Sequence, residues 1–220
     1  MIWGLDDRIW MLFGCLLYVG ASVSALVVFR QKRPQSSVVF NTLLIGGFAL
    51  HTLGLYARGL EDQAFPVLNF FEVLQVIAWC AILLDLVIRT VFHLKFLDVF
   101  ASALAGVLGL FALSVTAWDV VPIVHEPVRN PWTEFHAALA IFSYAVFGIL
   151  ALVSLMYVLQ HLALKRHKAG GFFSRLPAIR QLEEISSRLL LMGVTLLTVS
   201  IAIGYLNYFE SGSEVGLLKL

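Results

Sequence analysis

Charged side chains are scarce in this sequence. Asp, Glu, Lys and Arg make up 13% of its 220 residues, about half of the roughly 25% that is typical of soluble domains, and 60% of the residues are hydrophobic. This balance excludes a soluble domain with a charged surface, and we expect no nucleic-acid partner. The mean hydropathy of +0.90 indicates an integral membrane protein, surrounded by membrane lipid.

Cysteine is also rare, and its placement offers no metal or redox motif. The two cysteines, Cys15 and Cys80, lie inside apolar runs without CxxC spacing or a neighbouring histidine, so we interpret them as small buried hydrophobic residues. Zinc-ligand spacing and the serine hydrolase, P-loop and dinucleotide-binding motifs are absent as well. We therefore expect a protein without an enzymatic activity of its own.

Six apolar runs have the length of about 20 residues that a membrane-spanning helix needs. The connections are short, so the sequence predicts a single integral membrane domain over residues 1–220, an all-α transmembrane bundle. The expected helices cover residues 9–29, 38–56, 66–88, 97–117, 136–161 and 189–208. Before the last of these, residues 172–187 mix apolar and charged positions, which predicts an amphipathic helix lying on the membrane surface.

The distribution of Lys and Arg predicts how this bundle is oriented. Short loops that carry positive charge stay on the cytoplasmic side, and eleven of the fifteen Lys and Arg residues fall on one side of the expected helices. The eleven are Arg30, Lys32, Arg33, Arg89, Lys95, Lys165, Arg166, Lys168, Arg175, Arg180 and Arg188. Both termini are therefore expected on the outer side, together with the start of the third and fifth helices.

The third expected helix carries a stripe of polar and indole side chains. Asn69, Glu72, Gln75 and Trp79 follow one another at spacings of three, three and four, which places them on one face of a helix. Polar groups are costly in lipid, so this face should point inward or line a cavity. For Glu72, an alternative is that it only complements the dipole at the start of the helix.

Two histidines are expected in the outer half of the membrane. His51 lies near the outer end of the second helix and His136 opens the fifth. A neutral imidazole is a common axial ligand of haem iron, and it is also commonly hydrogen-bonded to a neighbouring helix. The spacing alone leaves both interpretations open, and both histidines are candidate haem ligands.

Three groups of residues together resemble a known family of membrane proteins. They are Pro66, Asn69, Glu72 and Trp79 after a short outer loop, the approach from Trp132 to His136, and the phrase Ser143-Tyr144-Ala145. This pattern resembles the cytochrome c assembly family of haem-handling membrane proteins, which includes CcsA, CcmC, HemX and YpjD, and it is most like the HemX and YpjD branch.

The resemblance implies a haem-binding protein of the bacterial cytoplasmic membrane that supports cytochrome c assembly. It implies haem as the cofactor, other maturation proteins and apocytochrome c as partners, and His136, His51, Asn69, Glu72 and Trp79 as the site, with the two histidines on the iron. The sequence lacks the family's tryptophan-rich WWD segment, which is expected of a shortened relative, of one part of a split protein, or of a protein that binds no haem. Alternatives are a non-catalytic regulator or scaffold in tetrapyrrole supply and a small-solute or ion transporter.

Overall fold

The protein folds into six long helices, each apolar enough to cross a membrane. The computed structural model describes residues 6–30, 37–92, 97–120, 131–165 and 177–217. The helices are α1 (Asp7–Arg30), α2 (Ser37–Asp62), α3 (Phe70–Phe92), α4 (Leu97–Ser114), α5 (Pro131–Lys165) and α6 (Ile179–Leu217), with a 3-10 turn η1 (Thr116–Trp118) after α4. The expectation of an all-α bundle with six spanning helices is confirmed.

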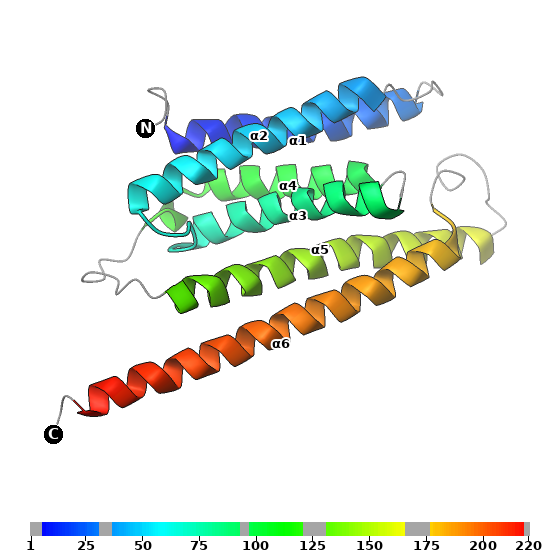
Figure 1. The fold of residues 1–220 in the computed structure, drawn as a ribbon. Helices are drawn as coiled ribbons and strands as arrows, with labels where there is room; N and C mark the ends of the chain where they lie inside the picture. The colour runs from blue at the N-terminus through cyan, green and yellow to red at the C-terminus, as the bar shows by residue number, and fades with distance from the viewer. Residues whose placement is uncertain (1–5, 31–36, 93–96, 121–130, 166–176, 218–220) are drawn as a thin grey trace.

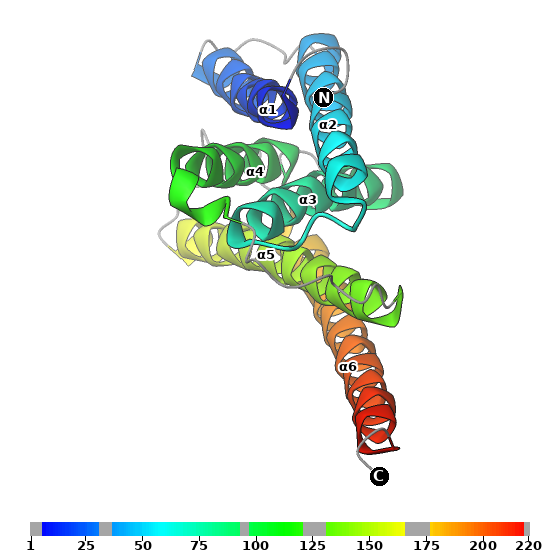
Figure 2. The same ribbon diagram turned by 90° about the vertical axis from the view of Figure 1, so that its left-hand side faces the viewer.

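The helices are stacked in layers (Figure 1). α1 and α2 form one layer, α3 and α4 the next, and α5 and then α6 follow on the far side of α3 and α4. α6 packs along α5 and lies at the edge of the bundle, as the turned view in Figure 2 also shows. α1 begins and α6 ends at the same end of the bundle (Figure 1). We call this the outer end, after the side on which the charge distribution places it.

Two apolar clusters hold the layers together. One joins α3, α4 and α5 and includes Leu182 and Ile185 of α6, and the other lies between α1, α2, α3 and α4. α1 and α2 approach closely because Gly47 has no side chain: a Cβ there would lie 2.9 Å from the ring of Tyr18. Small residues at such crossings are typical of helix pairs in membranes.

Most helix ends differ from the expected ones, and tertiary contacts account for two of the differences. α2 continues to Asp62 rather than ending at residue 56, and its last turn carries Arg58, which is held by ion pairs from three other segments. α3 starts at Phe70 rather than at residue 66, because the side chain of Asn69 accepts a hydrogen bond from the backbone N–H of Glu72 and caps the helix there.

The structure differs from the expected separate surface helix over residues 172–187 in the part of that segment that it describes. Residues 172–176 lie outside the described part of the chain, and residues 179–187 are the first turns of α6, continuous with its spanning part. Leu182 and Ile185 are almost fully buried in the core, while Glu184 and Arg188 form an ion pair on the exposed side. Burial of this apolar stripe against the bundle accounts for the continuity of α6 through these residues.

Candidate functional site

His136 lies in the second turn of α5, at the outer end. α5 opens with Pro131, a favoured first residue because proline lacks the N–H that would have no partner there, and Trp132 and Phe135 in the first turns are exposed. The side chain of His136 is half-buried and contacts α6. The imidazole is therefore within reach of a ligand while it is held by a neighbouring helix.

One ring nitrogen of His136 is fixed by the backbone of α6. Nδ1 lies 2.6 Å from the carbonyl oxygen of Ser200, and a carbonyl only accepts, so this contact places the proton of a neutral ring on Nδ1. The Ser200 hydroxyl in turn donates to the carbonyl of His136, at 2.9 Å. Within the described part of the chain, Nε2 has no hydrogen-bond partner, so its lone pair is free to bind.

The imidazole fits against α6 because one position of that helix carries no side chain. A Cβ on Gly204 would lie 2.7 Å from Cε1 and 2.9 Å from Nδ1 of His136, which is closer than real Cβ contacts come. Gly204 lies one turn beyond Ser200, so the two residues form a notch for the ring. A second notch occurs nearer the start of α6, where a Cβ on Gly193 would lie 2.7 Å from the ring of Phe147.

Asn69 and Glu72 join a charged cluster at the start of α3. The Asn69 amide and the backbone N–H of Leu68 donate to the carboxylate of Glu72, at 2.9 and 2.7 Å. Arg58 also donates to this carboxylate from Nε, at 3.0 Å. Glu72 is fully buried, so these contacts replace the water that its charge loses.

The remaining members of this cluster tie α1, α2 and the segment after η1 to α3. Arg58 pairs with Asp7 at 3.0 Å, with Asp119 and, within α2, with Asp62. Arg8 pairs with Asp119 and donates to the carbonyl of Leu113 at 2.9 Å. We call these side chains the outer charged cluster; its members are Asp7, Arg8, Arg58, Asp62, Glu72 and Asp119. It contains four acidic and two basic side chains.

The charged residue just before α1 adds to this negative excess. A side-chain hydrogen bond with Asp7 and the nearby Arg8 hold the pKa of Asp6 below its usual range, so Asp6 stays ionised at neutral pH.

His51 lies deep in the bundle and faces α1. Its side chain is fully buried, a Cβ on Gly14 would lie 2.9 Å from its backbone nitrogen, and its ring centroid is 5.8 Å from that of Tyr18. Neither ring nitrogen has a hydrogen-bond partner among the described residues. α3 and α4 lie between this layer and α5 (Figures 1 and 2).

Trp79 and Gln75 form hydrogen bonds with different helices, α2 and α4 respectively. The indole N–H of Trp79 donates to the hydroxyl of Thr52 on α2, at 2.8 Å, and Trp79 lines a pocket between α2 and α3. The Gln75 amide is buried and donates to the carbonyl of Gly109 on α4, at 3.0 Å. The expectation that this helix face points inward or lines a cavity therefore matches these contacts.

The five residues expected to form one site lie in four places. Glu72 belongs to the outer charged cluster and Asn69 is hydrogen-bonded to it, Trp79 lines the α2–α3 pocket, His51 lies in the α1–α2 core and His136 at the α5–α6 contact. Among the described residues, the two histidines contact different helices: His51 lies against α1 and His136 against α6. Ser200 and Gly204 were not expected at the site from the sequence, although a serine and a glycine four residues apart on an apolar helix are a signal of close packing.

Comparison with known proteins places these features in a family. The sequence model described as "Cytochrome C assembly protein" matches residues 67–208, a span that includes Asn69, Glu72, Trp79 and His136 but not His51. Protein HemX of Brevibacillus brevis is 30% identical over 188 residues, which are 86% of this chain and 69% of that protein.

Two further relatives extend the comparison. Protein HemX of Bacillus subtilis (strain 168) is 27% identical, over 89% of this chain and 71% of its own length. The cytochrome c biogenesis protein CcsA of Chlamydomonas reinhardtii is 28% identical, over 83% of this chain and 51% of its own length. No solved structure matches the chain significantly.

Proposed function

The chain belongs to the cytochrome c assembly protein family, and we propose that within this family it binds haem without covalent attachment, with His136 as an axial ligand of the iron. Membership supports a role in cytochrome c biogenesis for a multi-pass membrane protein. We further propose that it acts without catalysis, in the bacterial cytoplasmic membrane, alongside other maturation proteins that deliver haem to apocytochrome c.

The contact between His136 and α6 is the observation that carries this proposal. A histidine that ligates a metal almost always donates its other ring N–H to a carbonyl, a carboxylate or water, which fixes the tautomer and the ring orientation. His136 has this arrangement: Nδ1 is 2.6 Å from the Ser200 carbonyl, and Nε2 has no described partner. The imidazole is thus set up to offer Nε2 to an iron atom before any ligand arrives.

The surroundings of His136 fit a flat apolar ring system. Trp132 lies one turn before His136 and is 59% exposed, and Tyr205 follows Gly204 and is 62% exposed. Exposed aromatic side chains at a membrane boundary supply apolar contact area for a macrocycle. When bound, haem would supply the iron and be the cargo; His136 would hold and orient it.

The outer charged cluster has a positioning role in this proposal. Its ion pairs fix the start of α3 and the end of α2 relative to α1, which gives the outer end a rigid frame. We propose that Asn69 and Glu72 act in this way, through Arg58, and that they do not touch the macrocycle. Trp79 acts similarly on the α2–α3 contact, through Thr52.

A haem titration tests the proposal. The purified protein is titrated with haem in detergent, and the Soret absorption is compared between the unmodified chain, His136→Ala and His161→Ala. His161 is an exposed histidine near the opposite end of α5, so it controls for adventitious binding. We expect a saturable Soret band that His136→Ala abolishes and His161→Ala leaves intact.

The alternative, a regulator or scaffold in tetrapyrrole supply, predicts a different result. A scaffold forms a stable complex with a protein partner, and that complex does not depend on His136. A Soret band that is absent, or equal in both histidine variants, would overturn the haem proposal and leave the scaffold.

A further inference from the structure

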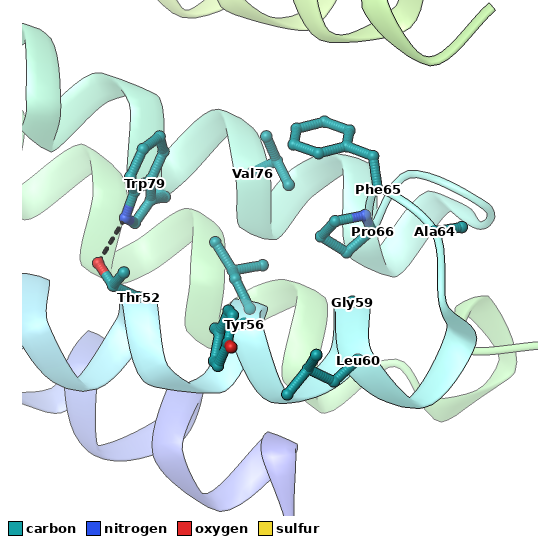
Figure 3. Close-up of a pocket in the computed structure, with 10 residues that line it drawn as sticks. Thr52, Tyr56, Gly59, Leu60, Ala64, Phe65, Pro66, Val76 and Trp79 are labelled. Atoms are coloured by element: carbon teal, nitrogen blue, oxygen red, sulfur yellow. Dashed lines mark hydrogen bonds between the residues drawn. The ribbon is translucent and has the colours of Figure 1, made fainter. Parts of the chain in front are cut away.

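A pocket of about 390 Å³ opens between α2 and α3 (Figure 3). Its walls come from α2, from the connection to α3 and from α3 itself. It is lined by Thr52, Leu55, Tyr56, Gly59 and Leu60 of α2, by Ala64 of the connection, and by Val76 and Trp79 of α3. None of the residues around the pocket belongs to the contact between α5 and α6, so the pocket is separate from the proposed haem site.

The polar groups at the inner end of the pocket are already paired with one another. The indole N–H of Trp79 donates to the Thr52 hydroxyl, at 2.8 Å, and that hydroxyl donates to the carbonyl of Phe48, at 2.7 Å. Figure 3 shows the first of these bonds between the two helices. An occupant therefore meets no unpaired donor at this end, and its buried part must be apolar.

The pocket runs from the lipid-facing surface to the core. Tyr56 and Leu60 are exposed on α2, whereas Leu55 and Val76 are almost fully buried. At the connection, the chain turns back at Gln63 (φ 48°), and the N–H of Ala64 donates to the carbonyl of Gly59, at 3.2 Å. The missing side chain of Gly59 and the small one of Ala64 leave the space that the pocket occupies.

The charges near the pocket determine which lipid headgroups are favoured beside it. Arg58, next to Gly59, is engaged by carboxylates of the outer charged cluster, which has four acidic and two basic members. A negatively charged headgroup would be repelled at this position, and a zwitterionic headgroup would not.

We propose that this pocket binds one acyl chain of a zwitterionic phospholipid whose headgroup stays at the outer membrane surface. The chain enters between α2 and α3 and reaches Val76 and Trp79, and the second chain remains in the bilayer. Burial of methylene groups against these apolar walls supplies the binding free energy. The bound lipid then fills the space between two helices that are joined at this level by the bond between Trp79 and Thr52.

Photolabelling with a defined lipid tests this assignment. The full chain is placed in lipid nanodiscs that contain phosphatidylethanolamine with a diazirine in one acyl chain, irradiated, digested and mapped by mass spectrometry. We expect the label on residues 52–60 and 76–79. Val76→Phe fills the pocket and should lower this labelling about tenfold, the loss expected when a few methylene groups can no longer be buried. Val87→Phe, on the exposed side of α3, should leave the labelling unchanged.

A second pair of variants covers the case in which Val76→Phe does not fold. Leu60→Trp narrows the mouth of the pocket, and Leu53→Trp places the same side chain on an exposed position of α2 that does not line it. Equal labelling within either pair would overturn the proposal, as would equal competition by phosphatidylglycerol or stoichiometric co-purification of an isoprenoid quinone. Haem content should stay the same in all four variants, because the pocket and His136 share no residue.

Discussion

Gly204→Ala is expected to weaken haem binding although residue 204 would not contact the iron. The added Cβ would lie 2.7 Å from Cε1 and 2.9 Å from Nδ1 of His136, whereas carbon atoms pack best at about 3.5–4.0 Å. The ring must therefore move by roughly 1 Å, which lengthens the bond of 2.6 Å between Nδ1 and the Ser200 carbonyl beyond hydrogen-bonding distance.

The expected loss of haem affinity follows from the role of the hydrogen bond between Nδ1 of His136 and the Ser200 carbonyl. Loss of an outer partner of a metal-ligating histidine typically costs 10–100-fold in affinity, or about 1.4–2.7 kcal/mol. The assay is a haem titration in detergent that is followed by Soret absorption. Gly148→Ala is the matched control: it lies on α5, and a Cβ at this position would have no atom of another described segment within 4 Å. That substitution should stabilise the helix by about 0.5–1 kcal/mol without changing the Kd for haem.

A further variant separates the carbonyl from the hydroxyl of the same residue. Ser200→Ala removes the hydroxyl, which lies 3.1 Å from Nδ1, and keeps the carbonyl that accepts from Nδ1 at 2.6 Å. Its Kd should therefore change less than that of Gly204→Ala, because the shorter of the two contacts remains. A role of α6 in haem binding is refuted if Gly204→Ala binds haem as tightly as Gly148→Ala while His136→Ala binds none. In that case the imidazole would ligate iron without support from α6.

Three further outcomes are expected. The first two are measured by thermal unfolding with a dye that reacts with the two buried cysteines, and the third by Soret absorption. Arg58→Leu should destabilise the protein by about 3–5 kcal/mol, because it leaves buried carboxylates unpaired. Arg188→Leu should change stability by about 0.5 kcal/mol or less, since the pair of Arg188 with Glu184 is exposed. Equal loss of stability in the two variants would contradict this expectation. Asn69→Ala should cost about 1 kcal/mol through loss of the α3 cap, and no shift would mean that water replaces the cap. His51→Leu should retain the Soret band that His136→Ala removes, and its loss would make His51 a ligand.

The sequence was sufficient to predict the architecture because membrane helices are encoded locally. The length of each apolar run and the positions of Lys and Arg depend on nearby residues alone, and together they predict six helices with both termini at one end. Asn69 was expected inside the third helix and not as its cap, although an acidic residue three positions after an N-cap is a local signal. Glu72 lies at the helix start and is also fully buried, where it pairs with Arg58.

The features that differ from the sequence-based expectations depend on partners that are distant in sequence. The extension of α2 to Asp62 rests on carboxylates 51 and 61 positions away from Arg58 in the chain. The merging of residues 179–187 into α6 rests on burial of Leu182 and Ile185 in a core built by other helices. The separation of His51 from His136 depends on which face of α2 meets α1, and periodicity does not specify the neighbour that a face meets.

The contact between His136 and α6 links ligand binding to helix packing. α6 lies at the edge of the bundle, and its outer half meets α5 through the notch at Gly204, the Ser200 bonds and a bond of 2.9 Å from Asn207 to Thr133. The residue proposed to hold iron is therefore also one that fastens α6. A ligand that requires this ring orientation must stabilise the docked helix, by about 2.7 kcal/mol at a concentration 100 times its Kd. Haem should then protect the outer half of α6 from hydrogen exchange in the unmodified chain and much less in Gly204→Ala, whereas a ligand bound elsewhere would protect both equally.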